Sequence, residues 1–216
     1  MERARRFEVV VGREVVPGLL WTPSGAPGTA TVLLGHGRTS DKQGGHLLAL
    51  VPRLVRRGWN AVALDAPGHG ERRASNAEGW PRPEPAQVTR EWHAALDYLR
   101  ESGHLETERL GYWGISMGTG LGIPLITEEP RVRAAVLGLM HIDWPGADLR
   151  SLAPEVRCPV LFLVNWDDTR APRGQAMELF DLFGTEDKRL HTYPGEHGQL
   201  PDEAMADAEE FLARYL

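Results

Sequence analysis

A serine flanked by glycines is the clearest chemical signal in the sequence. Ser116 is the middle residue of the pattern GxSxG, which is formed by Gly114–Gly118. An apolar run precedes the pattern and a run of small residues follows it, so the serine is expected at a sharp turn from a strand into a helix. Bulky neighbours would collide with adjacent backbone there, and the start of the helix favours developing negative charge. These features predict a nucleophile.

A second glycine-rich turn lies nearer the start of the chain. The apolar run Thr31–Gly35 leads into His36 and Gly37, and a glycine lets the backbone approach a neighbouring group closely. An early strand that ends in a HisGly turn, with GxSxG later, resembles the α/β-hydrolase superfamily. The turn Asp65–Gly70 is similar to the DxPGHG sequence that is common in this superfamily.

The resemblance implies an oxyanion hole, in which two backbone N–H groups bind the oxygen that becomes negative during acyl transfer. The two donors would be the N–H groups of Arg38 and Met117. His36 and His69 are then interpreted as structural residues of their turns. The Arg38 side chain either braces its loop or faces an anionic group of a substrate, and we favour the brace.

A serine hydroxyl needs a base, and the superfamily that this chain resembles has the order serine, acid, histidine. Of the eight histidines, only His191 and His197 follow the later strands. His191 falls inside the last expected strand, whereas His197 falls in the loop after it. Because a loop at the carboxyl end of a strand can reach the turn that holds Ser116, we predict that His197 is the base.

Two aspartates, Asp167 and Asp168, follow the expected strand Val160–Asn165. In the hydrolases that this segment resembles, the acid stands four residues before a proline that opens the next helix, and Asp168 has this spacing to Pro172. The resemblance therefore implies Asp168 as the acid that orients the histidine. Asp143 stays open as an alternative, because it follows the preceding strand, from which some members of the superfamily recruit their acid.

The elements that must position these residues follow from short apolar runs that alternate with longer amphipathic segments. This pattern is typical of parallel strands joined by helices and predicts an α/β fold. The expected strands are Phe7–Val11, Val15–Trp21, Thr31–Gly35, Asn60–Asp65, Arg109–Gly114, Ala134–Leu139, Val160–Asn165 and Arg189–Tyr193, of which the first two should form an antiparallel hairpin. The expected helices are His46–Arg57, Glu91–Ser102, Pro172–Phe183 and Pro201–Leu216.

The resemblance adds the arrangement of these elements: a mostly parallel sheet of about eight strands with helices on both faces. The length of 216 residues predicts one domain, residues 1–216. Only about twenty residues separate the strand that ends near Leu139 from the one that begins near Val160, which is too few for a folded cap domain. We therefore predict an open active site. Whether the protein is a monomer or a homodimer stays open.

Composition narrows the possible partners. With 42% hydrophobic and 25% charged residues, the chain is an ordinary globular sequence. The formal net charge of −6 is spread along the chain, which argues against a nucleic acid as partner. No apolar run is long enough to cross a membrane. Because Cys158 is the single cysteine and no signal peptide is recognisable, the protein is expected to be cytoplasmic.

No nucleotide-binding glycine motif and no metal-ligand pattern occurs, so no cofactor or metal is expected. A small molecule is the expected substrate, and Trp144 and Trp166 are candidate walls of its pocket. The leading hypothesis is hydrolysis of a carboxylic ester through an acyl-enzyme on Ser116.

Several alternatives share the same residues or the same fold. The triad could serve a peptidase or amidase, a thioesterase or an acyltransferase, because fold and triad do not fix the leaving group. A ligand-binding protein without activity is the alternative from another class. The small design without a lid also resembles dienelactone hydrolases, although those have a cysteine in place of Ser116.

Overall fold

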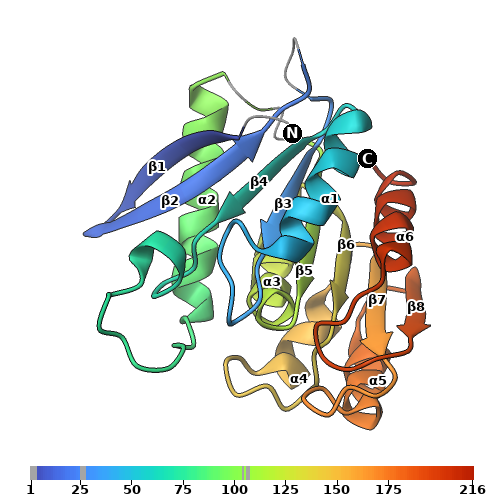
Figure 1. Cartoon of the computed structure of the whole chain (residues 1–216). Coiled ribbons are helices and arrows are strands. Elements are labelled where there is room, and N and C mark those ends of the chain that lie inside the picture. The colour runs from blue at the N-terminus through green and yellow to red at the C-terminus, as the bar shows by residue number, and fades with distance from the viewer. Residues whose placement is uncertain (1–3, 25–27, 104, 106–107) are drawn as a thin grey trace.

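A sheet of eight strands forms the centre of the computed structural model, which describes residues 4–24, 28–103, 105 and 108–216. The strands lie in the order β1-β2-β4-β3-β5-β6-β7-β8 (Figure 1). Their bounds are β1 (Arg5–Val11), β2 (Glu14–Trp21), β3 (Thr31–Gly35), β4 (Asn60–Leu64), β5 (Leu110–Ile115), β6 (Val132–Gly138), β7 (Val160–Asn165) and β8 (Lys188–Tyr193). The expected strands are confirmed, with ends shifted by two residues at most.

Strand direction divides the sheet into two parts. β2 pairs antiparallel with both β1 and β4, and every other neighbouring pair is parallel. Apart from the edge strand β8, the parallel strands are nearly continuous apolar runs; all residues of β5 and β7, for example, are buried. This is the pattern of strands that helices cover on both faces. The mostly parallel α/β sheet that the sequence predicts is confirmed.

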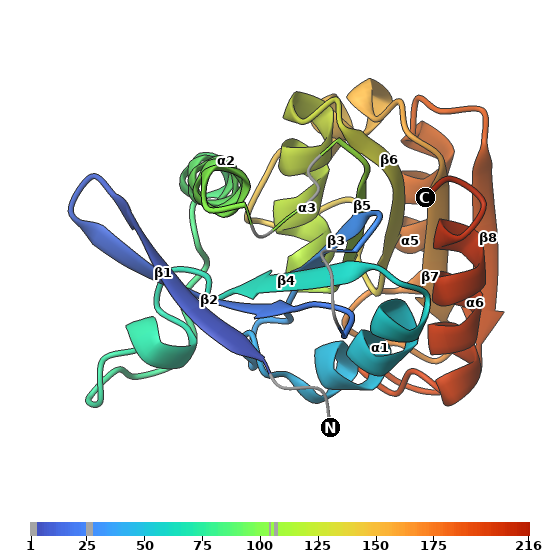
Figure 2. The ribbon, with the colours of Figure 1, turned by 90° about the horizontal axis from the view of Figure 1, so that it is seen from above.

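Helices cover both faces of the sheet (Figure 2). α1 (Gly45–Arg56) and α6 (Asp202–Leu212) pack on one face, and α2 (Pro85–Glu101), α3 (Met117–Glu128) and α5 (Arg173–Leu182) pack on the other. Each face has its own core of buried apolar side chains. In α1 these are the residues that the helical spacing predicts: Leu47, Leu50, Val51, Leu54 and Val55.

Two helix boundaries were predicted wrongly. α6 ends at Leu212 and not at Leu216, and α2 begins at Pro85 and not at Glu91. The proline stands in the first turn, where its missing N–H has no intrahelical partner to lose, and Val88 buries the added turn against the core.

The connection between β6 and β7 is short. It contains a single helical turn, α4 (Leu149–Leu152), and the short 3₁₀ helix η2 (Ala153–Glu155). Another 3₁₀ helix, η1 (Gly70–Arg72), follows β4. No large cap is present among the residues that the structure describes, as predicted. The carboxyl ends of the parallel strands are therefore free to carry a site.

Candidate active site

Ser116 stands at the sharp turn between β5 and α3. Its backbone has φ 54° and ψ −124°, in a region that residues with a side chain seldom adopt. A Cβ atom on Gly114 would lie 2.7 Å from the carbonyl oxygen of Gly118, and one on Gly118 would lie 2.3 Å from the carbonyl oxygen of Gly35. Both glycines of the motif are thus required by close backbone contacts, and the strained turn presents Ser116 to the surface.

The side chain of Thr119 links this turn to the neighbouring strand β6. Its hydroxyl oxygen lies 2.7 Å from the carbonyl oxygen of Gly114, and it accepts a hydrogen bond of 2.8 Å from the N–H of Gly138 at the end of β6. The side chain is fully buried. The turn is therefore tied to the neighbouring strand, which keeps the serine rigid relative to the sheet.

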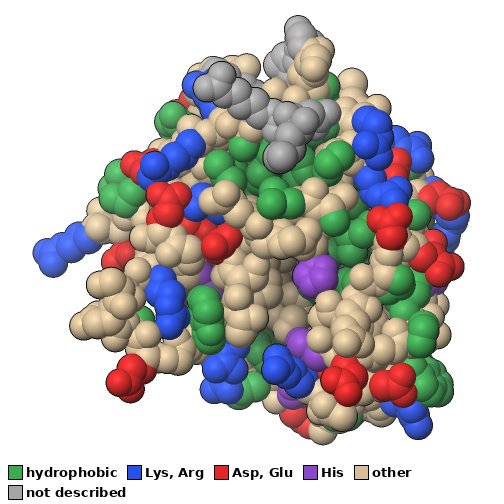
Figure 3. Space-filling model, in the orientation of Figure 1, with side chains coloured by type: hydrophobic (Ala, Val, Ile, Leu, Met, Phe, Trp, Pro, Cys, Tyr) green, Lys and Arg blue, Asp and Glu red, His purple; other side chains and the backbone are tan. Residues whose placement is uncertain are grey.

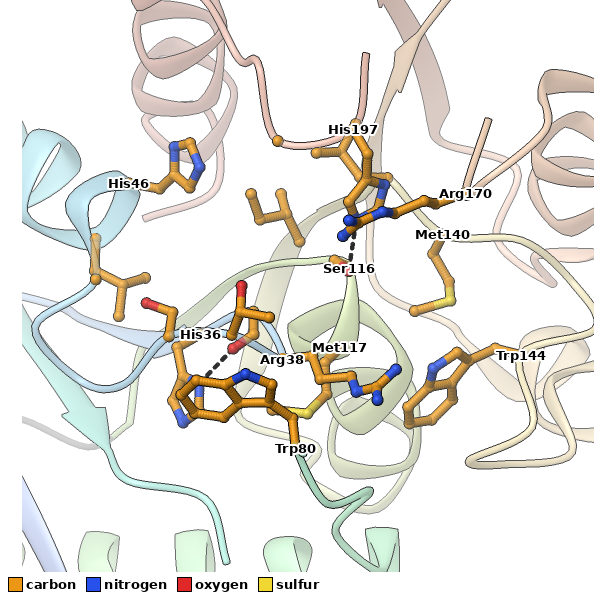
Figure 4. A pocket seen from close by; sticks show the side chains of 18 of the residues that line it. His36, Arg38, His46, Trp80, Ser116, Met117, Met140, Trp144, Arg170 and His197 are labelled. Carbon is orange, nitrogen blue, oxygen red and sulfur yellow. Dashed lines mark hydrogen bonds between the residues drawn. The ribbon is translucent and has the colours of Figure 1, made fainter. Parts of the chain in front are cut away.

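Two hydrogen bonds join Ser116 to the later loops. The Oγ atom of Ser116 lies 2.9 Å from Nε2 of His197, and Nδ1 of His197 lies 2.7 Å from a carboxylate oxygen of Asp168 (Figure 4). His197 comes from the loop after β8, and Asp168 from the loop after β7. The structure thus brings together the serine, histidine and aspartate that the sequence singles out, although 81 residues separate Ser116 from His197.

The surroundings of Asp168 favour its ionised form. Burial alone would raise the pKa of this carboxyl, but the hydrogen bonds from His197 and from the N–H groups of Ala171 and Arg170 outweigh it, and the pKa lies below its ordinary value. The side chain is only 5% exposed. A buried carboxylate that accepts three hydrogen bonds can hold the adjacent imidazole in one tautomer and orientation.

Asp143, the alternative acid, lies elsewhere. Its carboxylate is exposed and contacts the guanidinium of Arg150 at 2.9 Å and the side-chain amide of Gln175 at 3.3 Å. Asp167 accepts a bond from the N–H of Gly195. Neither carboxylate is bonded to His197 in the part of the chain that the structure describes.

The two residues predicted to supply the oxyanion donors lie at the pocket that contains Ser116. These residues, Arg38 and Met117, both line the pocket, and neither amide donates to another group among the described residues. The loop of Arg38 lies next to the serine because β3 pairs with β5 in a register that sets Gly35 beside Gly114. Free donors at this position are what an oxyanion hole requires.

Two buried histidines fix the loop of Arg38. His36 accepts a hydrogen bond from the N–H of Ala66 at its Nε2 atom, so its Nδ1 atom carries the proton and donates to the carbonyl oxygen of Gly37. Burial lowers the pKa of His36 to about 4, which keeps the ring neutral. Nε2 of His69 lies 2.8 Å from the carbonyl oxygen of Arg38. The structural roles expected for both histidines agree with these contacts.

An ionic cluster beneath the loop adds a further anchor that the sequence did not reveal. Lys42 is 2% exposed, and its ammonium group contacts the carboxylates of Asp65 at 2.5 Å and Glu71 at 2.7 Å. Asp65 also accepts hydrogen bonds from the N–H groups of Lys42 and Glu71. Because such a buried charge is costly without its partners, the cluster holds the loop after β3 against the turn after β4.

The serine opens into a pocket of about 790 Å³. Figure 3 shows the corresponding hollow, with histidine side chains inside it and Lys or Arg side chains along its lower edge. Trp144 lines the pocket, and its ring packs so closely on Gly120 that a Cβ atom there would lie 2.5 Å away.

Trp166, the other predicted wall, was placed wrongly. It lies outside the pocket, is 52% exposed, and stacks on the guanidinium of Arg173 at 4.5 Å. The sequence reveals that its loop is near the acid but not which way the indole points.

Several wall residues were missed, among them Arg82, Met140, His141 and Arg170. Arg170 stands two residues after the predicted acid Asp168, and this nearness could have indicated that it lines the pocket. Nothing in the sequence indicates the same for the other three residues. The favoured brace role of the Arg38 side chain was also wrong: its guanidinium has no hydrogen bond or ion pair in the described structure, and it points into the pocket (Figure 4).

No group of three or more His, Cys, Asp and Glu side chains is arranged to bind a metal ion among the residues that the structure describes. None of the helices described is long and apolar enough to cross a membrane.

Comparison with known proteins decides the family. The sequence model of a family described as serine aminopeptidase, S33, matches residues 26–138, which is more than half of the chain. The chain belongs to this family of α/β hydrolases. No curated protein matches it by sequence.

Solved structures agree with this assignment. A PEG-bound cold-adapted esterase from an Arctic intertidal metagenomic library is similar, with 38% identity and a TM-score of 0.90 over 99% of this chain and 94% of that one. An esterase of Pyrococcus furiosus has the same fold at 18% identity, with a TM-score of 0.81 over 99% of this chain and 93% of that one. The protein is a hydrolase of the α/β-hydrolase superfamily.

Proposed function

We propose that the protein hydrolyses carboxylic esters of small molecules through an acyl-enzyme on Ser116. The observation that carries this proposal is the chain of two hydrogen bonds from Ser116 through His197 to Asp168. The sequence identity of 38% to an esterase over nearly the whole chain supports an ester as the bond that is cleaved.

The reaction follows from this geometry. Nε2 of His197 takes the proton from Oγ of Ser116 as that oxygen attacks the ester carbonyl carbon, and Asp168 stabilises the imidazolium that results. The N–H groups of Arg38 and Met117 bind the oxyanion, each contributing about 2.7–4 kcal/mol to the barrier reduction. His197 then protonates the alcohol that leaves. A water molecule, deprotonated by His197, attacks the acyl-enzyme; the bond to Oγ of Ser116 breaks, His197 returns the proton to this oxygen, and the acid is released.

An aminopeptidase is the second candidate, because the family description names one. Binding the ammonium group of a peptide N-terminus requires carboxylates near the scissile bond. No Asp or Glu lines the pocket in the part of the chain that the structure describes, while three arginines do. The charge of the pocket therefore favours the ester over the aminopeptidase substrate.

The test combines labelling with a substrate panel. A fluorophosphonate probe is expected to label the wild-type protein and the Ser75→Ala variant, whose lost hydroxyl is exposed, but not Ser116→Ala. Para-nitrophenyl esters, aminoacyl para-nitroanilides and acyl-CoA thioesters are then compared by kcat/KM, and the esters should lead. Equal labelling of Ser116→Ala would refute the nucleophile, and turnover of anilides without turnover of esters would reverse the order of the two candidates.

A further inference from the structure

The pocket carries a positive charge that ester hydrolysis alone does not require. Arg38, Arg82 and Arg170 all line it. They come from three separate loops, after β3, before α2 and after β7. In Figure 4, Arg38 and Arg170 enter from different sides of Ser116, and Trp80 and Trp144 stand on either side of Arg38.

These guanidinium groups have no protein partner in the part of the chain that the structure describes. Among the described residues, none of the three side chains forms an ion pair or a hydrogen bond, although the chain has a net charge of −6. Two carboxylates near them in sequence have other partners: Asp168 is bonded to His197, and Asp41 accepts a hydrogen bond from the N–H of Gln43.

The rest of the lining differs in character. Leu47, Ile115 and Leu139 are apolar and also line it. The pocket therefore offers both apolar and cationic side chains to an ester. Arginine binds carboxylates with paired N–H donors. All three arginine residues are exposed, so an anionic group that enters the pocket from solvent can reach them.

Building on the ester hydrolysis proposed above, we propose that the natural substrate is an ester that carries an anionic group, a carboxylate, bound by Arg38, Arg82 and Arg170. The apolar side chains that line the pocket then contact the uncharged half of the same molecule. The carboxylate can belong to the acyl half or to the alcohol half, since the arginines lie around the serine, and the test distinguishes the two.

The test uses two matched pairs of esters. Mono-para-nitrophenyl glutarate against para-nitrophenyl pentanoate places the charge on the acyl half. Para-carboxyphenyl butyrate against para-carbamoylphenyl butyrate places it on the alcohol half. In at least one pair, the anionic ester is expected to exceed its neutral partner in kcat/KM by about tenfold or more. This ratio should fall with added NaCl, because salt screens partly exposed charges.

Variants separate the pocket from the overall charge of the protein. Arg82→Gln and Arg170→Gln should each lower the anionic-to-neutral ratio by about tenfold. Arg90→Gln removes the same charge from an exposed position on α2 outside the pocket and should leave the ratio unchanged. An equal fall in Arg90→Gln would assign the preference to the field of the whole molecule and overturn the proposal.

A binding measurement keeps the two proposals distinguishable. In Ser116→Ala, calorimetric titration should show tighter binding of the anionic ester than of its neutral partner, and Arg170→Gln in that background should abolish the difference. Hydrolysis of neutral esters without any anionic preference would refute this inference and leave the proposed function intact. Preferential anion binding in a protein that hydrolyses no ester would refute the proposed function and leave the anionic subsite intact.

Discussion

Asp168 shows how a single side chain can be committed to one charge state. Its oxygens accept hydrogen bonds from His197 and from the amides of Arg170 and Ala171, and these bonds outweigh the effect of burial on its pKa. The same bonds fix the direction of the carboxylate, and thus the direction of the imidazole next to it. The reactivity of Ser116 therefore depends on a group that does not contact it.

The first prediction concerns this group. Asp168→Asn should lower kcat for para-nitrophenyl esters by about 10⁴-fold, because the amide stabilises the wrong imidazole tautomer. The matched variant is Asp143→Asn, which changes an exposed carboxylate of the alternative loop and should leave kcat within about twofold. A larger loss in Asp143→Asn than in Asp168→Asn would exchange the roles of the two aspartates.

The second prediction concerns the stability of the fold in acid. The pKa of His36 is about 4 in the folded protein and 6.5 as its ordinary value, mainly because of burial. Between these two values the unfolded chain binds a proton that the folded chain does not, so stability falls as the pH drops from about 6.5 to about 4. The loss attributable to His36 is about 3 kcal/mol.

Urea unfolding between pH 4 and pH 8 measures this effect. His36→Gln, which keeps a hydrogen-bonding side chain without a titrating group, should reduce the slope of the unfolding free energy against pH by up to about 1.4 kcal/mol per pH unit in that window. If wild type and variant have parallel pH profiles, His36 is not the group responsible.

For single residues, the sequence predicts which residues belong to the site better than it predicts the direction of their side chains. Ser116, His197 and Asp168 could be singled out because each follows a strand in a recognisable order, and the carboxyl ends of parallel strands meet at one edge. Trp166 and Arg170 share a loop with Asp168, yet one points to solvent and the other into the pocket. Rotamers in irregular loops are set by tertiary contacts, which no local pattern encodes.

At the scale of helices and strands, a close backbone contact between α3 and the end of β3 determines how the two elements lie relative to each other at the site. The backbone of Gly118 packs against Gly35 so closely that a Cβ atom would lie 2.3 Å from a carbonyl oxygen. This contact sets the start of α3 against the loop of Arg38, and so the two N–H donors against one another. A shift of α3 here would move the N–H of Met117, one of the two proposed oxyanion donors.

The third prediction follows from that contact. Gly118→Ala should destabilise the protein by about 2 kcal/mol or more and lower kcat as well, because the added carbon meets backbone that cannot move aside. Gly174→Ala makes the same change in α5, where a Cβ atom meets nothing within 4 Å, and should raise the stability slightly. Thermal unfolding and ester kinetics on both variants check this; similar effects of the two changes would contradict it.

Element types were easier to predict than the cluster that anchors them. The strands were found because buried parallel strands leave continuous apolar runs between glycine-rich turns. Lys42, by contrast, stands in a polar loop where lysine is normally exposed, and its burial depends on Asp65 and Glu71, which come from another turn. Such a cluster arises only when the fold brings distant charges together.

For the molecule as a whole, the sheet order places the loops after β3, β5, β7 and β8 around one pocket. Ser116, Asp168 and His197 come from three of these loops, and the Arg38 amide comes from the fourth. The helices on both faces keep the strand ends in register. The loop between β6 and β7, which could have covered the pocket, instead supplies one wall through Trp144.

The last prediction follows from this architecture. Enzymes whose active site lies under a lid gain activity when the lid opens at a lipid surface. In the described part of this chain, α4 and η2 are the only helical elements between β6 and β7, and the pocket is already open to the surface. We therefore expect that binding at an oil–water interface opens no lid and does not increase the activity.

The rate of tributyrin hydrolysis should accordingly rise smoothly with concentration and saturate, without a jump at the solubility limit of the substrate. A lipase with a lid, assayed in parallel, provides the positive control for such a jump. A severalfold increase of the rate at the solubility limit would mean that a segment of this protein closes over Ser116 in solution. A smooth curve would instead indicate that the side chains lining the pocket select the substrate. An open site has no closing lid that could distinguish one substrate from another.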